Sequence, residues 1–123
     1  MNTKDFVEAV RAAVYNAATK GTVDVLERPP GRSPDAELVK LSEWYHHLIS
    51  EDRENILRVA DMAAKQATYN FLLILDGLLT VESVGSKGKL ELSYNDGSAR
   101  TRLNDESANQ LSSLFKMNPR ANQ

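Results

Sequence analysis

One carboxylate stands in a strongly apolar setting, in the segment FLLILDGLLTV at residues 71–81. A buried carboxylate needs a partner or becomes neutral, because burial penalises its charge. Asp76 could therefore be a catalytic acid, a helix cap or the partner of Arg100 or Arg102. Because Gly77 follows, where a helix can stop or bend, we expect Asp76 to bind nearby backbone N–H groups or one of these arginines. The four residues would then form a structural junction between a helix and a hairpin.

The two histidines are adjacent, at His46 and His47. Neighbouring residues on a helix point about 100° apart, so this pair does not chelate one metal ion. Glu43, His47 and Glu51 are spaced four residues apart and could present three ligands on one helical face. We expect Ser50 to end that helix before Glu51, and the sequence offers no second helix with a histidine. The sequence therefore predicts a solvent-facing surface and no bound metal.

Recognisable catalytic motifs are missing from the sequence. It contains no cysteine, no GxSxG turn and no glycine-rich phosphate-binding loop. The acids at residues 51, 52 and 54 cluster at an expected helix start, where capping explains them. We expect no catalytic residue, no enzyme activity and no cofactor. The alternative is a small-molecule-binding or catalytic domain with a site near Asp76 and the hairpin arginines.

The composition is that of an ordinary globular domain. The 123 residues are 41% hydrophobic and 26% charged, with a net charge of −2. We predict one domain at residues 1–117 and a disordered tail at residues 118–123. Basic residues form only a small patch without interleaved aromatics, which argues against nucleic-acid binding. No export signal is visible and the apolar run is shorter than the roughly 20 residues that span a bilayer, so we expect a cytoplasmic protein away from membranes.

The middle of the chain is acidic. Residues 34–83 carry nine Asp or Glu against four Lys or Arg. Pairing with other segments of the chain is one explanation, and an acidic surface for a basic partner is the other. On the second interpretation, Trp44 is an aromatic anchor. The complete contact surface would comprise Glu43, Trp44, His47, Glu51, Asp52 and Glu54.

Helical periodicity predicts three main helices. The first spans residues 4–20, with Thr3 as its N-cap and Gly21 as its stop, followed by a short extended piece and a proline-rich loop. The second spans residues 34–49 and is capped by Ser33. The third begins near residue 51 after a tight turn and folds back on the second. We expect its inner stripe to contain Ile56, Val59, Ala60, Ala63 and Ala67, and its residues 71–75 to be buried all round.

The Asp96-Gly97 dipeptide predicts a two-residue hairpin turn between alternating strands. In that register Tyr94 pairs with Ala99 and Leu92 with Thr101. Residues 81–84 could add a third strand or continue the third helix. Asn104 or Asp105 would cap a short last helix. The predicted fold is thus α+β: a three-helix core, a C-terminal antiparallel β-hairpin or small meander, and a short terminal helix.

Part of the chain resembles a known pattern. The segments LSEWYHHLISEDRENI, FLLILDGLLTVES, GKLELSY and LN, within residues 41–104, resemble a family of small bacterial proteins without an assigned activity. In that family the LDG segment ends a long helix before a hairpin, and the resemblance implies no catalytic residue.

Proteins of this size and build also serve as immunity proteins against toxins. We therefore expect a non-enzymatic interaction module of the immunity or inhibitor kind, whose partner is a toxin or another basic protein. A structural homodimer with Trp44 and Tyr45 at its interface is a further alternative.

Overall fold

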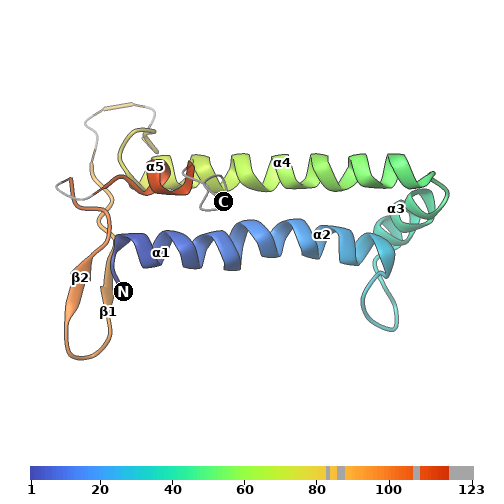
Figure 1. Cartoon of the computed structure of the whole chain (residues 1–123), viewed down its shortest axis with the longest axis horizontal. Helices are drawn as coiled ribbons and strands as arrows, with labels where there is room; N and C mark the ends of the chain where they lie inside the picture. The colour runs from blue at the N-terminus through green and yellow to red at the C-terminus, as the bar shows by residue number, and fades with distance from the viewer. Residues whose placement is uncertain (83, 86–87, 107–108, 117–123) are drawn as a thin grey trace, which may run out of the picture. The chain divides into compact units, whose positions relative to one another are not determined.

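The computed structural model describes residues 1–82, 84–85, 88–106 and 109–116. This part of the chain is mostly helical, with one small antiparallel sheet of two strands (Figure 1). Its elements are α1 (Thr3–Val10), the π-helix η1 (Arg11–Asn16), α2 (Ala17–Glu27), α3 (Ala36–His46), α4 (Ser50–Leu75), β1 (Ser93–Asn95), β2 (Arg100–Arg102) and α5 (Leu111–Lys116).

These elements fall into two compact units. The terminal unit comprises residues 1–12 and the described residues from 66 onward, and the middle unit comprises residues 13–65. The single domain expected at residues 1–117 stays a prediction, and the tail expected at residues 118–123 lies outside the described residues. Within the described ranges, none of the helices has both the length and the apolar character needed to cross a membrane.

In the middle unit the first helical stretch continues well past Gly21. The stop expected at Gly21 and the extended piece after it were wrong, since α2 runs to Glu27. A glycine inside a helix costs only about 1 kcal/mol, and the hydroxyl of Thr22 donates to the carbonyl of Ala18 at 2.8 Å. The helix ends where Pro29 follows Arg28, which takes an extended conformation (φ −149°, ψ 97°), because proline disfavours helical geometry in the residue before it.

The start of α3 is set by Asp35, and the Ser33 cap was a wrong prediction. The Asp35 carboxylate accepts a hydrogen bond from the backbone N–H of Leu38 at 3.2 Å, which satisfies one of the free donors at the helix start. Further along α3, the buried Ser42 donates to the carbonyl of Leu26 at 2.6 Å. This bond fixes α3 against α2.

Within the middle unit, the less exposed side of α4 differs from the inner stripe that the sequence predicts. Val59 is 57% exposed, and Ala63 and Ala67 are exposed too, whereas Ile56 and Ala60 are half-buried. Asp61, which is not part of that stripe, accepts a hydrogen bond from the Tyr15 hydroxyl at 2.6 Å. A polar contact from outside the expected stripe therefore joins α4 to the N-terminal helical stretch.

In the terminal unit α1 packs against α5. Arg11 donates from Nη2 to the carbonyl of Phe115 at 2.9 Å, and its guanidinium lies 4.8 Å from the centre of the Phe115 ring. A cation is favourable there, because the last carbonyls of a helix lack partners within it. The core also contains three fully buried leucines and a valine: Val7, Leu72, Leu103 and Leu111.

Two local expectations for this unit were wrong. The N-cap of α1 is Asn2 and not Thr3. The Asn2 side chain accepts a hydrogen bond from the N–H of Asp5 at 2.8 Å, and the Asp5 carboxylate accepts one from the N–H of Asn2. Thr3 instead donates to the carbonyl of Leu103 at 3.1 Å. Residues 71–75 are not buried all round, because Phe71 is 59% exposed.

The hairpin forms with a register different from the predicted one. Tyr94 lies opposite Thr101, and not Ala99, so the pairing is shifted by two residues. The last strand pair is Asn95 with Arg100, so four residues, Asp96 to Ala99, connect the strands. Within this turn the backbone N–H of Asp96 donates to the carbonyl of Ala99. A shift of two keeps each side chain on its expected face. The described residues of the segment 81–84 form neither strand nor helix, so both predictions for it were wrong.

The Asp96 carboxylate should make this turn sensitive to acid. Hydrogen bonds from the backbone of Ser98, then of Ala99, and from the Ser98 hydroxyl lower the pKa of Asp96 to about 2, from 3.8. A pKa that is lower in the folded state stabilises the turn above pH about 4 and loses that effect as the pH falls to about 2. The protection of the Ala99 amide against hydrogen exchange, taken relative to an unfolded chain at the same pH, should therefore fall over this range.

The control is Asp96→Asn, which keeps an acceptor oxygen but cannot titrate. In that variant the acid-induced loss of protection should be absent. An equal loss of protection in both proteins would show that Asp96 does not control the turn.

Candidate functional site

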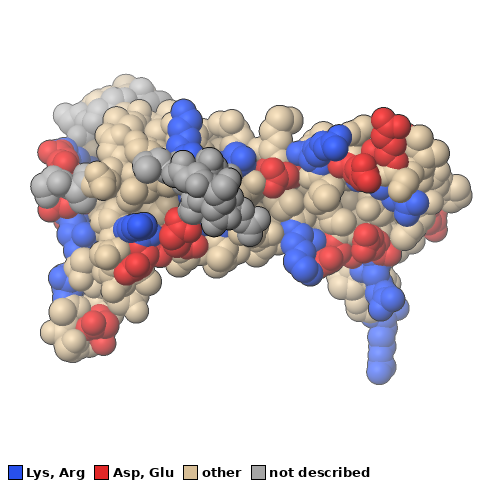
Figure 2. Space-filling view, in the orientation of Figure 1, with Lys and Arg blue, Asp and Glu red and all other residues tan. Residues whose placement is uncertain are grey.

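The six residues expected to contact a partner lie where α3 meets α4 in the middle unit. All six are exposed, and we call this surface the acidic corner: Glu43, Trp44, His47, Glu51, Asp52 and Glu54. Figure 2 shows several Asp and Glu side chains over this part of the chain. Glu43 and Trp44 come from α3 and His47 caps it, while the other three occupy the first turns of α4.

A tight connection positions the acidic corner. The N–H of His47 donates to the carbonyl of Trp44 at 3.1 Å, and that of Leu48 to Tyr45 at 3.2 Å. Below the surface, Tyr45 is only 5% exposed, and the Arg53 guanidinium lies 6.0 Å from its ring centre. Tyr45 is therefore covered by this unit's own side chains, whereas Trp44 is open to solvent.

The histidines contact backbone carbonyls and do not gather with the acids into a metal site. His47 Nδ1 lies 2.6 Å from the carbonyl oxygen of Glu43, and His46 Nε2 lies 2.8 Å from that of Glu27. Among the residues that the structure describes, no group of three His, Asp or Glu side chains could hold a metal ion. Glu51 belongs to α4 and not to α3, since α4 begins at Ser50.

Large apolar side chains accompany the acids of the corner. Leu41 is 50%, Trp44 49% and Ile49 64% exposed. Isolated exposed apolar side chains are normal, but several within one turn of a charged cluster are typical of protein-binding surfaces. The corner and its neighbours thus present an exposed aromatic side chain, exposed aliphatic side chains and negative charge.

In the terminal unit Asp76 ends one helix and begins another. Its Oδ1 accepts from the backbone N–H of Leu111 at 2.8 Å, and its Oδ2 from the N–H and the hydroxyl of Ser112 at 2.9 and 2.5 Å. These N–H groups belong to the first turn of α5, which has no partners for them within the helix. The α5 cap expected at Asn104 or Asp105 was therefore wrong. Asp76 binds backbone N–H groups, which the sequence placed among its possible partners.

The end of α4 has a Schellman motif built on Gly77. The N–H of Gly77 donates to the carbonyl of Ile74, and that of Leu78 to Leu73, both at 3.0 Å. Gly77 has φ +77°, a left-handed conformation that glycine adopts without a steric penalty. The motif turns the chain so that Asp76 can reach α5.

Asn104 connects three segments of the terminal unit. Its Nδ2 donates to the carbonyls of Leu75 at 2.7 Å and Leu90 at 2.8 Å. Its Oδ1 accepts from the N–H of Leu92 at 2.9 Å and from Arg102 Nε at 2.7 Å. An asparagine amide has two donors and two acceptor positions, so all four are used. Asn104 thus ties the end of α4 to the chain entering β1 and to the end of β2.

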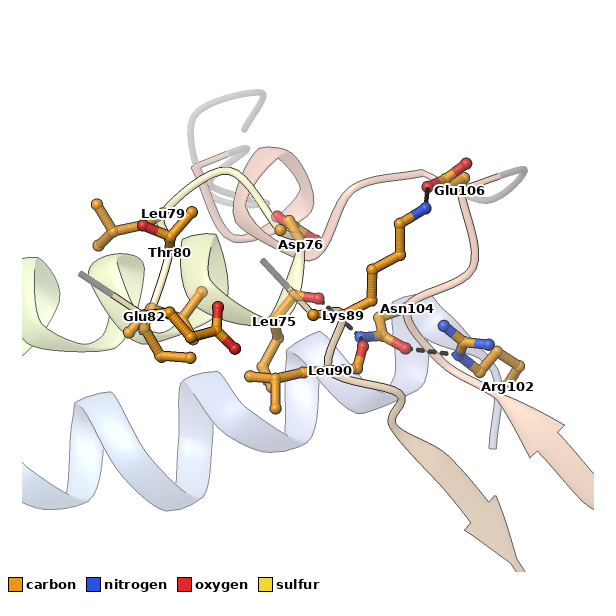
Figure 3. Close-up of a pocket in the computed structure, with 14 residues that line it drawn as sticks. Leu75, Asp76, Leu79, Thr80, Glu82, Lys89, Leu90, Arg102, Asn104 and Glu106 are labelled. Carbon is orange, nitrogen blue, oxygen red and sulfur yellow. Dashed lines mark hydrogen bonds and ion pairs between the residues drawn. The ribbon is translucent and has the colours of Figure 1, made fainter. Parts of the chain in front are cut away.

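A cavity of about 250 Å³ lies beside this network in the terminal unit (Figure 3). Asp76 and Gly77 contribute to its wall, and so does Arg102 of the two hairpin arginines. The rest of the wall includes apolar and charged side chains: Leu75, Leu79, Leu90, Glu82, Lys89 and Glu106. Sites for drug-sized ligands measure about 300–1,000 Å³. This cavity lies just below that range, so it has room for a single smaller ligand.

Two ion pairs lie around this cavity. Lys89 Nζ is 2.5 Å from Glu106 Oε1, and this hydrogen bond raises the pKa of Lys89 and lowers that of Glu106. Arg102 Nη1 is 3.7 Å from Glu91 Oε1. Arg102 therefore binds Glu91 and Asn104, and the structure shows Asp76 bound to α5.

In comparisons with protein-family models, with curated proteins and with solved structures, nothing matches the chain. The structure brings the six acidic-corner residues together, whereas Arg100 lies on the exposed hairpin and not in the cavity wall. Sequence reasoning missed Asn104, Glu82 and Lys89 as wall residues, because their proximity arises from contacts between distant segments.

Proposed function

We propose that the chain is a non-enzymatic protein-interaction module of the immunity or inhibitor kind, which binds a basic protein partner through the acidic corner. The observation that supports this most is the half-exposed Trp44, flanked by exposed acids and by Ile49. Aromatic residues supply much of the energy at the centre of interfaces, and complementary charge speeds association and selects the partner. The cytoplasm is the proposed site of action.

The distribution of apolar side chains supports a module that works with a partner. In the described part of the chain, seven hydrophobic residues form the core, whereas fifteen large ones are exposed. A partner that covers some of these would remove apolar surface from water. We further propose that three main helical segments, the hairpin and the short last helix act as one scaffold for this surface.

The first test is affinity capture from the native host with the full chain carrying a tag. We expect one stoichiometric protein partner with a basic surface, and binding that weakens as salt is added. Trp44→Ala should weaken its binding about tenfold or more, because loss of a central aromatic contact costs about 2 kcal/mol. Binding constants of the purified pair would be measured by calorimetry.

Matched control variants distinguish specific binding at the acidic corner from nonspecific association through other exposed residues. Tyr94→Ala removes an aromatic residue of similar exposure, 43% against 49%, from the hairpin. The double change Glu51→Gln with Glu54→Gln should weaken binding and reduce its salt dependence, whereas Glu91→Gln with Glu106→Gln should not. Recovery of no stoichiometric partner, or equal effects of the two aromatic variants, would contradict the proposal.

A further inference from the structure

The hairpin of β1 and β2 is open to solvent on both of its faces. Every residue of β1 is exposed, and so are Arg100 and Thr101 of β2. In Figure 1 the hairpin projects away from α1 and α5 of its own unit. A hairpin of two strands is marginally stable by itself in water, and it gains stability when further strands or a helix cover it. The hairpin therefore offers its strand edges and its apolar side chains to a further chain.

The outer edge of β1 carries backbone groups that point away from β2. The carbonyl of Leu92 accepts from the N–H of Leu103 on β2's side, and the Asn104 side chain bonds to Leu90 and Leu92 on the same side. Because backbone groups alternate in direction along an antiparallel strand, those of residues 91, 93 and 95 point outward. In the part of the chain that the structure describes, β1 pairs with β2 alone. This edge is therefore a template for another strand.

The two edges of the sheet differ in charge. Two of the three residues of β2 are arginines, and charged side chains on an edge strand hinder pairing with another chain. The stretch 90–95, LELSYN, has Glu91 as its one charge. Leu90 is 46% and Tyr94 43% exposed, and they share a face because an even number of residues separates them. The edge of β1 therefore favours pairing, whereas the edge of β2 opposes it.

A second copy of β1 complements this edge. When two copies run antiparallel with Leu92 opposite its equivalent, Leu90 lies opposite Tyr94, and Glu91 lies opposite Ser93. Apolar side chains then meet apolar ones, and no two like charges lie directly opposite each other. The charge of Glu91 is also offset by a cation of its own hairpin, since Arg102 Nη1 lies 3.7 Å from Glu91 Oε1.

The same pairing is unfavourable for β2. Two antiparallel copies of β2 centred on Thr101 would place Arg100 of one copy opposite Arg102 of the other. Like charges directly opposite each other destabilise a strand pair. Self-pairing is thus favoured at the edge of β1 and disfavoured at the edge of β2.

We propose that β1 is the contact edge of a homodimer, in which two hairpins form one antiparallel sheet in the strand order β2-β1-β1-β2. Main-chain hydrogen bonds from residues 91, 93 and 95 join the copies, and Leu90, Leu92 and Tyr94 of both copies pack on one face. The contact is isologous, so it closes at two copies. Small contacts are typical of weak complexes, and a dissociation constant of about 0.1 mM is expected. The proposal does not depend on the acidic corner, which belongs to the middle unit.

Sedimentation equilibrium of the full chain between about 10 µM and 1 mM tests the proposal, because this range brackets the expected dissociation constant. We expect the apparent mass to rise from that of one chain toward that of two. Over the same dilution series, the amide signals of residues 91, 93 and 95 of the ¹⁵N-labelled chain should shift together. A monomer at every concentration, or association into species larger than a dimer, would overturn the proposal.

Two substitutions at one position locate the contact. Ser93→Pro removes an outward N–H of β1 and no bond to β2, and proline is tolerated in edge strands. Ser93→Glu keeps that N–H but places a carboxylate opposite Glu91 of the second copy. Within its own hairpin the new carboxylate lies opposite Arg102, which favours the fold. Each substitution should weaken dimerisation about tenfold or more.

Thr101→Glu is the matched control, because it adds the same charge to an exposed residue of β2. This variant should dimerise as the wild type does. If the ¹⁵N spectrum shows that Ser93→Pro disturbs the hairpin, Ser93→Glu decides. Dimerisation of Ser93→Glu with wild-type affinity, or an equal loss in Thr101→Glu, would refute the assignment of the contact to β1.

Discussion

Replacing Asp76 by alanine should lower the free energy of unfolding by about 1–3 kcal/mol. The carboxylate accepts three hydrogen bonds from Leu111 and Ser112 and is half-buried. Alanine would leave the N–H groups at the start of α5 without a partner in a partly buried place, and such groups are costly to leave unpaired. Urea unfolding of the full chain, followed by circular dichroism, measures the change.

Two further variants test whether the lost capping hydrogen bonds cause this destabilisation. Asp35→Ala removes another carboxylate N-cap, but an exposed one with a single hydrogen bond to Leu38, so its effect should lie near the lower end of the range for caps, about 0.5 kcal/mol. Asp76→Asn keeps an acceptor oxygen and should fall between wild type and Asp76→Ala. An Asp76→Ala protein as stable as wild type would contradict the capping role.

The helices could be located from the sequence, but their ends could not. Apolar periodicity marks where a helix forms, whereas its ends depend on which of several local partners is available. Asn2 and Asp35 each displaced a neighbouring hydroxyl residue as the cap, since all are acceptable caps and differ little in energy. Gly21 is compatible with a helix interior when the residues on both sides continue it. Propensity alone therefore places these boundaries only to within a few residues.

The register of the hairpin shows how side chains override a turn motif. Asp96-Gly97 favours a two-residue turn, but the Asp96 carboxylate instead binds the N–H groups of Ser98 and Ala99. This arrangement lengthens the turn to four residues and moves Leu103 opposite Leu92, where the N–H of Leu103 donates at 2.8 Å. The alternation of faces was predictable because the shift is an even number, while the pairing was not.

The two candidate sites also differ in how far the sequence could predict them. The acidic corner consists of residues close in sequence, so the helical pattern was enough to place them together on an exposed surface. The cavity depends on contacts between residues 74–82, 88–90 and 102–106. Asn104, which makes those contacts, looked like a cap for a neighbouring helix, because asparagine serves equally well in both roles.

The second large effect is expected at Asn104. Asn104→Ala should lower the free energy of unfolding of the chain by about 2–4 kcal/mol, since it removes four hydrogen bonds, each contributing about 0.5–1.5 kcal/mol net. The carbonyls of Leu75 and Leu90 and the N–H of Leu92 would then lose their partner together. Urea unfolding gives the magnitude, and amide exchange should show the hairpin and the end of α4 opening more readily.

Asn104→Asp separates hydrogen bonding from size. It keeps the shape and the acceptor for Leu92 but replaces the amide nitrogen, which makes both donated bonds, by one oxygen facing the carbonyls of Leu75 and Leu90. It should therefore destabilise the chain about as much as alanine. Asn95→Ala is the control, because Asn95 makes an exposed bond to the N–H of Gly97 in the same hairpin; its effect should stay at about 0.5–1 kcal/mol. If Asn104→Asp is as stable as wild type, the two donated bonds do not hold the segments, and the cavity wall must depend on its leucines alone.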